Sequence, residues 1–233
     1  MIDIGGEHDP AKANFDHHQF PRDHVPTCAL SLVLQHLGIY EDAQKFCPWL
    51  ETAEWLDARG PRQTAEWLNV DPFVVNQLSS PLDFSLLRYF GSETELAPGN
   101  PTWELMRRIG ADLLGYLRGL RANLNALEGK VERWTVGELA VCYLPRIEGM
   151  PPEIADALDI YVREQEFEVS ATVYPDKRGD GFGLCRFNDD VRFDFTQIES
   201  EEDVHFAHRQ GFIAKTSATD PDRLKALLQQ WLK

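Results

Sequence analysis

Two adjacent histidines beside an aspartate are the residues of this chain whose types and spacing best suit chemistry. They form the tetrapeptide Asp16-His17-His18-Gln19. Upstream, Asp3 closes an apolar opening stretch that is typical of a strand end, and the glycine turn Gly5-Gly6 follows it. A carboxylate at a strand end and imidazoles on the next loop predict a site for a divalent cation such as Mn²⁺ or Zn²⁺. The alternative is a solvated loop that binds nothing.

A further carboxylate, Asp57, ends an apolar helical stretch and is soon followed by Gly60. The carboxyl end of a helix carries partial negative charge, so an acid there is disfavoured unless a cation lies nearby. A solvated acid at the helix end is the alternative. Arg59 and Arg62 come directly after it, and they suit either phosphate binding or an ion pair with Asp57.

These residues belong to two blocks that are similar to a known family. Asp3–Pro10, followed by Phe15–Gln19, resembles the DHH phosphoesterase superfamily. Within it, the resemblance is to the melanocyte-proliferating-gene family, whose members carry Asp-x-Gly-Gly-x-x-Asp just before Asp-His-His-Gln. Near the other end of the chain, Val204–Ile213 is similar to that family's terminal His-x-x-Gly-Phe-Ile signature. The first block is quite specific, the last is less so, and the region between them matches weakly.

The resemblance implies hydrolysis of phosphodiesters with two divalent ions about 3.5–4 Å apart, which activate water and neutralise phosphoryl oxygens. Asp3 would bridge the ions, and His17 and Asp57 would be ligands of one of them. His18 would face the substrate phosphate, and Asp16 would orient the adjacent imidazoles. The expected cofactor is Mn²⁺, with Mg²⁺ as the alternative.

The same resemblance assigns substrate contacts to the second half of the chain. His208, Arg209 and Gly211 offer an imidazole, a guanidinium and a position for close approach, which suit a terminal phosphate or base. Arg59 is the corresponding candidate in the first half. The implied substrate is the end of a single-stranded RNA or DNA, a short oligonucleotide or a small phosphoester, bound in a cleft between two lobes.

One departure from the family pattern concerns its opening motif. The family begins with a further strand and a loop whose histidine and two acids hold the first ion, and nothing precedes Met1 in this sequence. A catalytically impaired metal- or nucleotide-binding protein is therefore the alternative to an enzyme. A shortened version of a complete enzyme is the third alternative.

The composition is that of an ordinary soluble globular protein, since 43% of the 233 residues are hydrophobic and 26% are charged. No apolar run approaches the roughly 18 residues of a spanning helix, so we expect no membrane segment. The net charge of −15 argues against broad binding to long nucleic acid, which needs many phosphate contacts. The four cysteines form no Cys-x-x-Cys pair, which favours free thiols and a cytoplasmic location.

Hydrophobic periodicity predicts an α/β protein with two lobes. Residues 1–98 are expected to form a DHH-like metal-binding domain with a parallel sheet and helices, incomplete at its amino end. A long linking helix is expected over 99–130, and a substrate-binding α/β domain with a mixed sheet over 131–233. A missing edge strand in the first lobe predicts a homodimer.

Local signals place the elements within these lobes. Thr27 is predicted to cap a helix from Cys28 to Leu37, and Gly60 to end a helix that starts near Glu41. Acidic residues 201–203 suggest the first turn of another helix. The strand candidates are Val131–Trp134, Leu139–Leu144, Phe167–Tyr174, Phe182–Phe187 and Arg192–Phe195.

Overall fold

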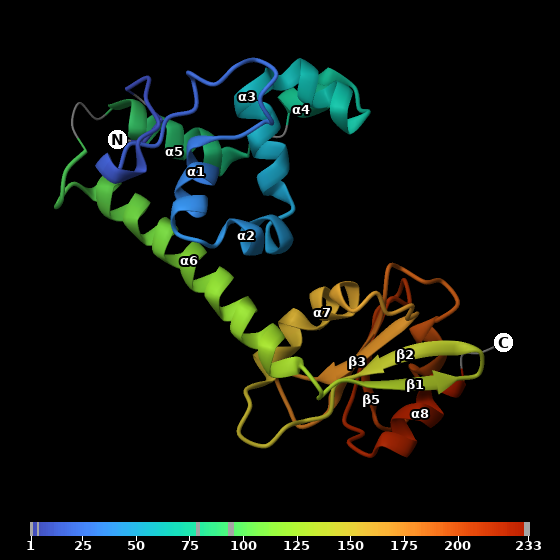
Figure 1. Ribbon diagram of the computed structural model, residues 1–233. Helices are drawn as coiled ribbons and strands as arrows, with labels where there is room; N and C mark the ends of the chain where they lie inside the picture. Colours follow the sequence, from blue (N-terminus) through green and yellow to red (C-terminus); the bar gives the residue numbers. More distant parts are fainter. Residues whose placement is uncertain (1, 4, 78–79, 93–95, 231–233) are drawn as a thin grey trace. The chain divides into compact units, whose positions relative to one another are not determined.

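The computed structural model describes residues 2–3, 5–77, 80–92 and 96–230. The chain divides into two compact units, Met1–Arg118 and Gly119–Lys233 (Figure 1). The division falls inside one helix, α6 (Pro101–Leu127), in the stretch for which the sequence predicts a long helix. No helix in the described part of the chain is long and apolar enough to cross a membrane.

Helices supply most of the regular structure of unit 1, whereas its described residues before Ala29 are mostly loop. The helix expected from Glu41 onward is two helices, because Pro48 cannot donate to the hydrogen-bond ladder and α2 ends before it. Besides the start of α6, the helices are η1 (Pro10–Lys12), α1 (Ala29–His36), α2 (Tyr40–Phe46), α3 (Trp49–Leu68), α4 (Pro72–Asn76) and α5 (Pro81–Ser92).

Helix α3 carries a break that matters for the site. Gly60 has φ 74° and ψ 171°, a combination that is essentially restricted to glycine, and Pro61 follows it. The first part of α3 therefore ends just before Gly60, where the sequence predicts a stop. Asp57 lies in the last turn before this break.

The parallel sheet expected in the first lobe does not form in the described residues of unit 1. One isolated parallel bridge, between Ile2 and Phe15, takes its place. The ladder cannot extend because Asp3 has φ 61°, outside the β region, and Gly5 has φ 107°. The expectation of a parallel-sheet lobe is corrected accordingly.

Unit 2 contains a six-stranded mixed sheet, which confirms the fold class expected for this half. The strand order is β1-β2-β3-β4-β6-β5, with β2 and β3 parallel and all other neighbours antiparallel. The parallel pair needs a crossover, which η2 (Pro152–Ala157) and α7 (Leu158–Glu164) supply. The strands are β1 (Glu132–Val136), β2 (Leu139–Tyr143), β3 (Ala171–Pro175), β4 (Phe182–Arg186), β5 (Val204–Ala207) and β6 (Ile213–Thr216).

Helices cover both faces of this sheet. Val173 of β3 points into a core that includes Leu224 of α8 (Pro221–Gln229) and Ile198 of η3 (Phe195–Ile198). Its neighbour Thr172 points the other way, toward a cavity that Leu158 of α7 also lines. Strand β3 is therefore buried on both faces, whereas β1 and β5 are partly exposed.

Two local expectations for unit 2 are wrong. Arg192–Phe195 is not a strand, because the Asp194 side chain accepts a hydrogen bond from the Thr196 N–H and starts η3 there. Residues 201–203 do not begin a helix but precede β5. Two of the acids, Glu201 and Asp203, instead pair with Arg223 of α8, each at 2.7 Å.

Candidate metal centre

Asp3 is held beside the histidine loop by backbone pairing. Its N–H donates to the Phe15 carbonyl at 2.8 Å, so the two segments run side by side just before the histidines. Its φ of 61° is uncommon for a residue with a side chain, although aspartate tolerates this region better than most. Such backbone strain at a polar residue is frequent at functional sites.

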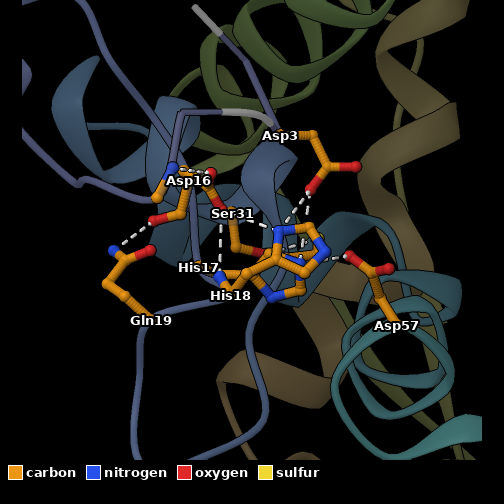
Figure 2. A network of polar contacts seen from close by, with 9 residues as sticks. Asp3, Asp16, His17, His18, Gln19, Ser31 and Asp57 are labelled. Atoms are coloured by element: carbon orange, nitrogen blue, oxygen red, sulfur yellow. Dashed lines mark hydrogen bonds and ion pairs between the residues drawn. The ribbon is translucent and has the colours of Figure 1, made fainter.

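His17 lies at the centre of the site (Figure 2). Its side chain is only 5% exposed, and its Nε2 lies 3.3 Å from Asp3 Oδ1 and 3.2 Å from Asp57 Oδ2. Yet this nitrogen forms no hydrogen bond with either carboxylate or with any other described residue. Both distances are short, but the geometry at His17 Nε2 does not allow a hydrogen bond to either carboxylate. This buried nitrogen therefore lies between two carboxylates without a hydrogen-bond partner.

Asp3, His17 and His18 each offer a ligand atom within 4.8 Å of the others, so they could share a divalent cation, and Asp57 approaches His17 without belonging to this group. Ligands bound about 2.1 Å from one ion lie roughly 3.0–3.4 Å apart at octahedral or tetrahedral angles. Both separations at His17 fall within this range. A cation would accept the unpartnered lone pair of His17 and offset the repulsion between Asp3 and Asp57. Two carboxylates with one imidazole form a donor set that suits Mn²⁺.

Asp57, the third predicted ligand, has an ionised form that its surroundings disfavour. Partial burial raises the pKa of Asp57, and the charge of Asp3 adds to the rise, while His17 and His18 oppose it. The arginines that follow do not pair with it. Arg62 pairs with Glu66 at 3.2 Å, and the Arg59 Nη2 donates to the His24 carbonyl.

Asp16 is buried and holds the loop that carries His17 and His18 in place through hydrogen bonds. Its Oδ1 accepts from the His18 N–H at 2.9 Å and from the His18 Nδ1–H at 2.7 Å, and its Oδ2 accepts from the Gly6 N–H at 2.7 Å. Chiefly through the His18 N–H, these bonds lower the pKa of Asp16 to about 2. Its stabilising effect is therefore present above its ordinary pKa near 3.8 and is lost as the pH falls through about 2. Asp16 is a positioning residue.

His18 is the exposed member of the pair, with 61% of its side chain accessible. The hydrogen bond to Asp16 raises the pKa of His18 and occupies its Nδ1, so Nε2 is the nitrogen left for a ligand. One ring nitrogen of His18 also lies within 4.8 Å of ligand atoms of Asp3 and His17. The nitrogen 3.8 Å from Asp3 Oδ1 is Nδ1, which is already bonded to Asp16, so His18 lies beside the candidate cation position without a free Nδ1 to bind the ion.

Removing the Asp16 carboxylate is expected to lower the pKa of His18 toward its ordinary value near 6.5. The stabilisation linked to the raised pKa is present below that value and is lost as the pH rises through the folded-state pKa. Proton NMR of the metal-free protein would follow the His18 ring signal, assigned with His18→Gln, in wild type and Asp16→Asn. The His36 signal serves as the internal reference. Identical His18 titrations in the two proteins would contradict the assignment of Asp16 as its partner.

A cavity of about 200 Å³ adjoins His17, His18 and Asp57. Arg59, predicted to bind substrate, lines it, and so do two residues that the sequence did not single out, Arg22 and Thr27. The prediction that Thr27 caps a helix is wrong, because Cys28 holds the cap position of α1 and no side chain caps that helix. Arg22 carries no sequence signal that distinguishes it from a surface arginine.

Unit 2 has a larger cavity, of about 790 Å³, in which Arg192 pairs with Asp190 and Ser170. Arg192 donates to Asp190 at 2.9 Å and to the Ser170 hydroxyl at 2.9 Å. The guanidinium of Arg133 lies over the Phe167 ring. The smaller cavity of unit 1 is therefore the better candidate, because it contains the unpartnered His17.

The predicted substrate residues of the second half lie in the turn between β5 and β6. The His208 N–H donates to the Ile213 carbonyl at 2.9 Å, and its ring packs on Phe212 with centroids 4.0 Å apart. Arg209 is exposed. Gly211 has φ 66°, and a Cβ there would lie 2.2 Å from Asp194 Oδ1, so packing within unit 2 accounts for this glycine.

Comparison of the chain with protein-family models, with curated proteins and with solved structures gives no match.

Proposed function

We propose that this protein is a metal-dependent phosphoesterase that hydrolyses phosphodiester bonds at the ends of single-stranded nucleic acid or short oligonucleotides. The observation that carries the proposal is the buried Nε2 of His17, unpartnered and 3.2 and 3.3 Å from two carboxylates. The resemblance of the two amino-terminal blocks to DHH phosphoesterases links this arrangement to phosphoester chemistry. A cation site alone does not specify a reaction, and the resemblance supplies the reaction class.

Asp3, His17 and Asp57 would hold the ion, which we take to be Mn²⁺, with Mg²⁺ as the alternative. When bound, the ion supplies Lewis acidity, which lowers the pKa of water and neutralises charge on phosphoryl oxygens. Asp16 holds the histidine loop through three hydrogen bonds, two from His18 and one from Gly6. This prior order reduces the reorganisation that binding requires.

His18 faces the substrate in this proposal. Asp16 fixes the ring through Nδ1 and leaves Nε2 for a phosphoryl or leaving-group oxygen. Because the hydrogen bond to Asp16 raises the pKa of His18, a larger fraction of the ring is imidazolium near neutral pH. A positive, proton-bearing group is what a phosphoester transition state requires as negative charge develops.

The substrate is expected to engage the protein over a short footprint. The net charge of −15 disfavours a long run of phosphate contacts, whereas Arg59, His208 and Arg209 suit a terminal nucleotide. The four cysteines are free thiols, which supports the proposed cytoplasmic location.

A second candidate is a protein that binds a metal ion or nucleotide without hydrolysing it. The observation that favours it is that the described residues bring together one group of three potential ligands, Asp3, His17 and His18. Two-metal hydrolysis requires a larger set of ligands.

The test is release of mononucleotides from short single-stranded RNA and DNA oligomers by the full chain. We expect release with Mn²⁺, none with chelator, and a loss of more than about 100-fold in Asp3→Asn, because that change removes a ligand charge. Glu7→Gln, a neighbouring exposed acid, is the matched control and should retain activity. Release that survives chelation or Asp3→Asn contradicts the proposal. Mn²⁺ binding without any release supports the second candidate.

A further inference from the structure

The Thr27 hydroxyl is buried without a hydrogen-bond partner. The residue is 7% exposed, and its Oγ1 neither donates nor accepts a hydrogen bond within the described part of the chain. Burying a hydroxyl in this state is unfavourable, so such groups in folded proteins usually have a role. Thr27 also lines the cavity of about 200 Å³ beside His17 and Asp57.

The surroundings of this hydroxyl favour an anion. Arg22 and Arg59 line the same cavity, and neither has a carboxylate partner among the described residues. Arg59 is anchored by its Nη2, which donates to the His24 carbonyl at the same cavity. Thr27 also lies two residues before α1 (Ala29–His36), whose amino end has no side-chain cap and carries partial positive charge.

The size of the cavity limits what enters it. About 200 Å³ is below the 300–1,000 Å³ usual for sites that enclose a whole small molecule. A tetrahedral oxyanion with part of its ester group is of suitable size. Because the Asp57 carboxylate shares the cavity, an anion is repelled until a cation neutralises that charge.

We propose that the Thr27 hydroxyl donates a hydrogen bond to a non-bridging oxygen of a terminal phosphoryl group held in this cavity, with Arg22 and Arg59 at its rim. The inference rests on the proposed function. It narrows the substrate class to phosphoesters that carry a phosphoryl group at the end of the nucleotide strand. Anion and cation then bind cooperatively. By linkage, phosphate tightens Mn²⁺ binding by the same factor as Mn²⁺ tightens phosphate binding.

The experiment is calorimetric titration of the Mn²⁺-loaded full chain with inorganic phosphate. Thr27→Val keeps the shape and removes the hydroxyl, and we expect it to weaken phosphate binding about 10-fold, the scale of one hydrogen bond to a charged group. Thr27→Ser keeps the hydroxyl and should stay within about threefold of wild type. The affinity for Mn²⁺ without phosphate, measured by EPR of the free ion, should be the same in all three proteins.

Three results would overturn the proposal: unchanged phosphate affinity in Thr27→Val, equal losses in the Ser and Val variants, or a parallel loss of Mn²⁺ affinity without phosphate. Thr27→Ala is measured alongside as a second variant without the hydroxyl and should resemble Thr27→Val. The outcome is separable from that of the proposed function. If phosphate binding depends on Thr27 but the protein has no hydrolytic activity, the proposed enzyme function is contradicted and the phosphate subsite stands. If the protein hydrolyses its substrate but phosphate binding does not depend on Thr27, only the subsite is contradicted.

Discussion

Replacing His17 with alanine is expected to eliminate Mn²⁺ binding and, with it, Mn²⁺-dependent hydrolysis. His17 Nε2 is the group that lies close to both carboxylates, so its loss leaves Asp3 and Asp57 without the ligand between them. Groups that merely orient metal ligands already contribute about 10–100-fold to affinity. We therefore expect the Kd for Mn²⁺ to rise by more than about 100-fold, measured by calorimetry.

The matched control for His17→Ala is His36→Ala. His36 is an exposed imidazole in the same unit, on α1, and its ring lies 5.2 Å from that of Phe15. It should leave the Kd for Mn²⁺ within about twofold of wild type, because it removes an imidazole without touching the site. Because His17 is buried, His17→Gln is included to preserve packing volume, and it should also lose binding. Wild-type Mn²⁺ affinity in a folded His17 variant would place the ion elsewhere.

Replacing Asp57 with asparagine is expected to weaken Mn²⁺ binding while stabilising the metal-free fold. The pKa of Asp57 is raised in the folded protein, chiefly by burial, so its ionised form opposes folding. This opposition is absent below the ordinary pKa near 3.8 and complete once the pH exceeds the raised value. The Tm of metal-free Asp57→Asn should therefore exceed that of wild type at pH 7, and the difference should vanish below about pH 4.

Metal binding should reverse the order of the two Tm values, so that wild type becomes more stable than Asp57→Asn. Saturating Mn²⁺ raises the Tm of wild type by mass action, and the rise should be much smaller in Asp57→Asn, whose Kd is expected to be at least about 10-fold higher. Glu51→Gln, an exposed acid in the first turn of the same helix, is the control and should keep the full rise. The account of Asp57 fails if Asp57→Asn gains as much stability from Mn²⁺ as wild type does.

The candidate metal ligands could be proposed from the sequence because their chemistry is local. Asp16-His17-His18-Gln19 places imidazoles and a carboxylate on one short loop, and an acid at the end of a helix, such as Asp57, is unfavourable without a nearby cation. Gly60, with φ 74°, ends the first part of α3 as its residue type predicts. Their proximity in space depends on tertiary packing, which only the structure provides.

Other features depend on interactions between distant residues and escaped the sequence analysis. Thr27 has the residue type of a helix cap but lies one residue before the cap position of α1, and only the structure shows that its buried hydroxyl has no hydrogen-bond partner. The strands β5 and β6 were missed because they are short and lie beside the acidic segment 201–203, of which Glu201 and Asp203 pair with Arg223 of α8. A single-sequence pattern carries no record of such a partner.

Sheet formation in the first lobe also could not be predicted from the sequence. The apolar opening stretch has the composition of a strand, but Asp3 adopts φ 61° and the extended pairing is limited to the bridge between Ile2 and Phe15. Strand propensity is a weak guide, because a strand forms only where neighbouring segments complete its hydrogen bonds. The bridge between Ile2 and Phe15 nevertheless places the Asp3 carboxylate beside His17.

The most direct measurement is an anomalous-diffraction map, recorded at the manganese absorption edge, of crystals of the full chain grown with Mn²⁺. One peak about 2.0–2.3 Å from His17 Nε2 and from a carboxylate oxygen of both Asp3 and Asp57 is the predicted result. A peak away from these three side chains, or none at a concentration that saturates binding in solution, would contradict the account.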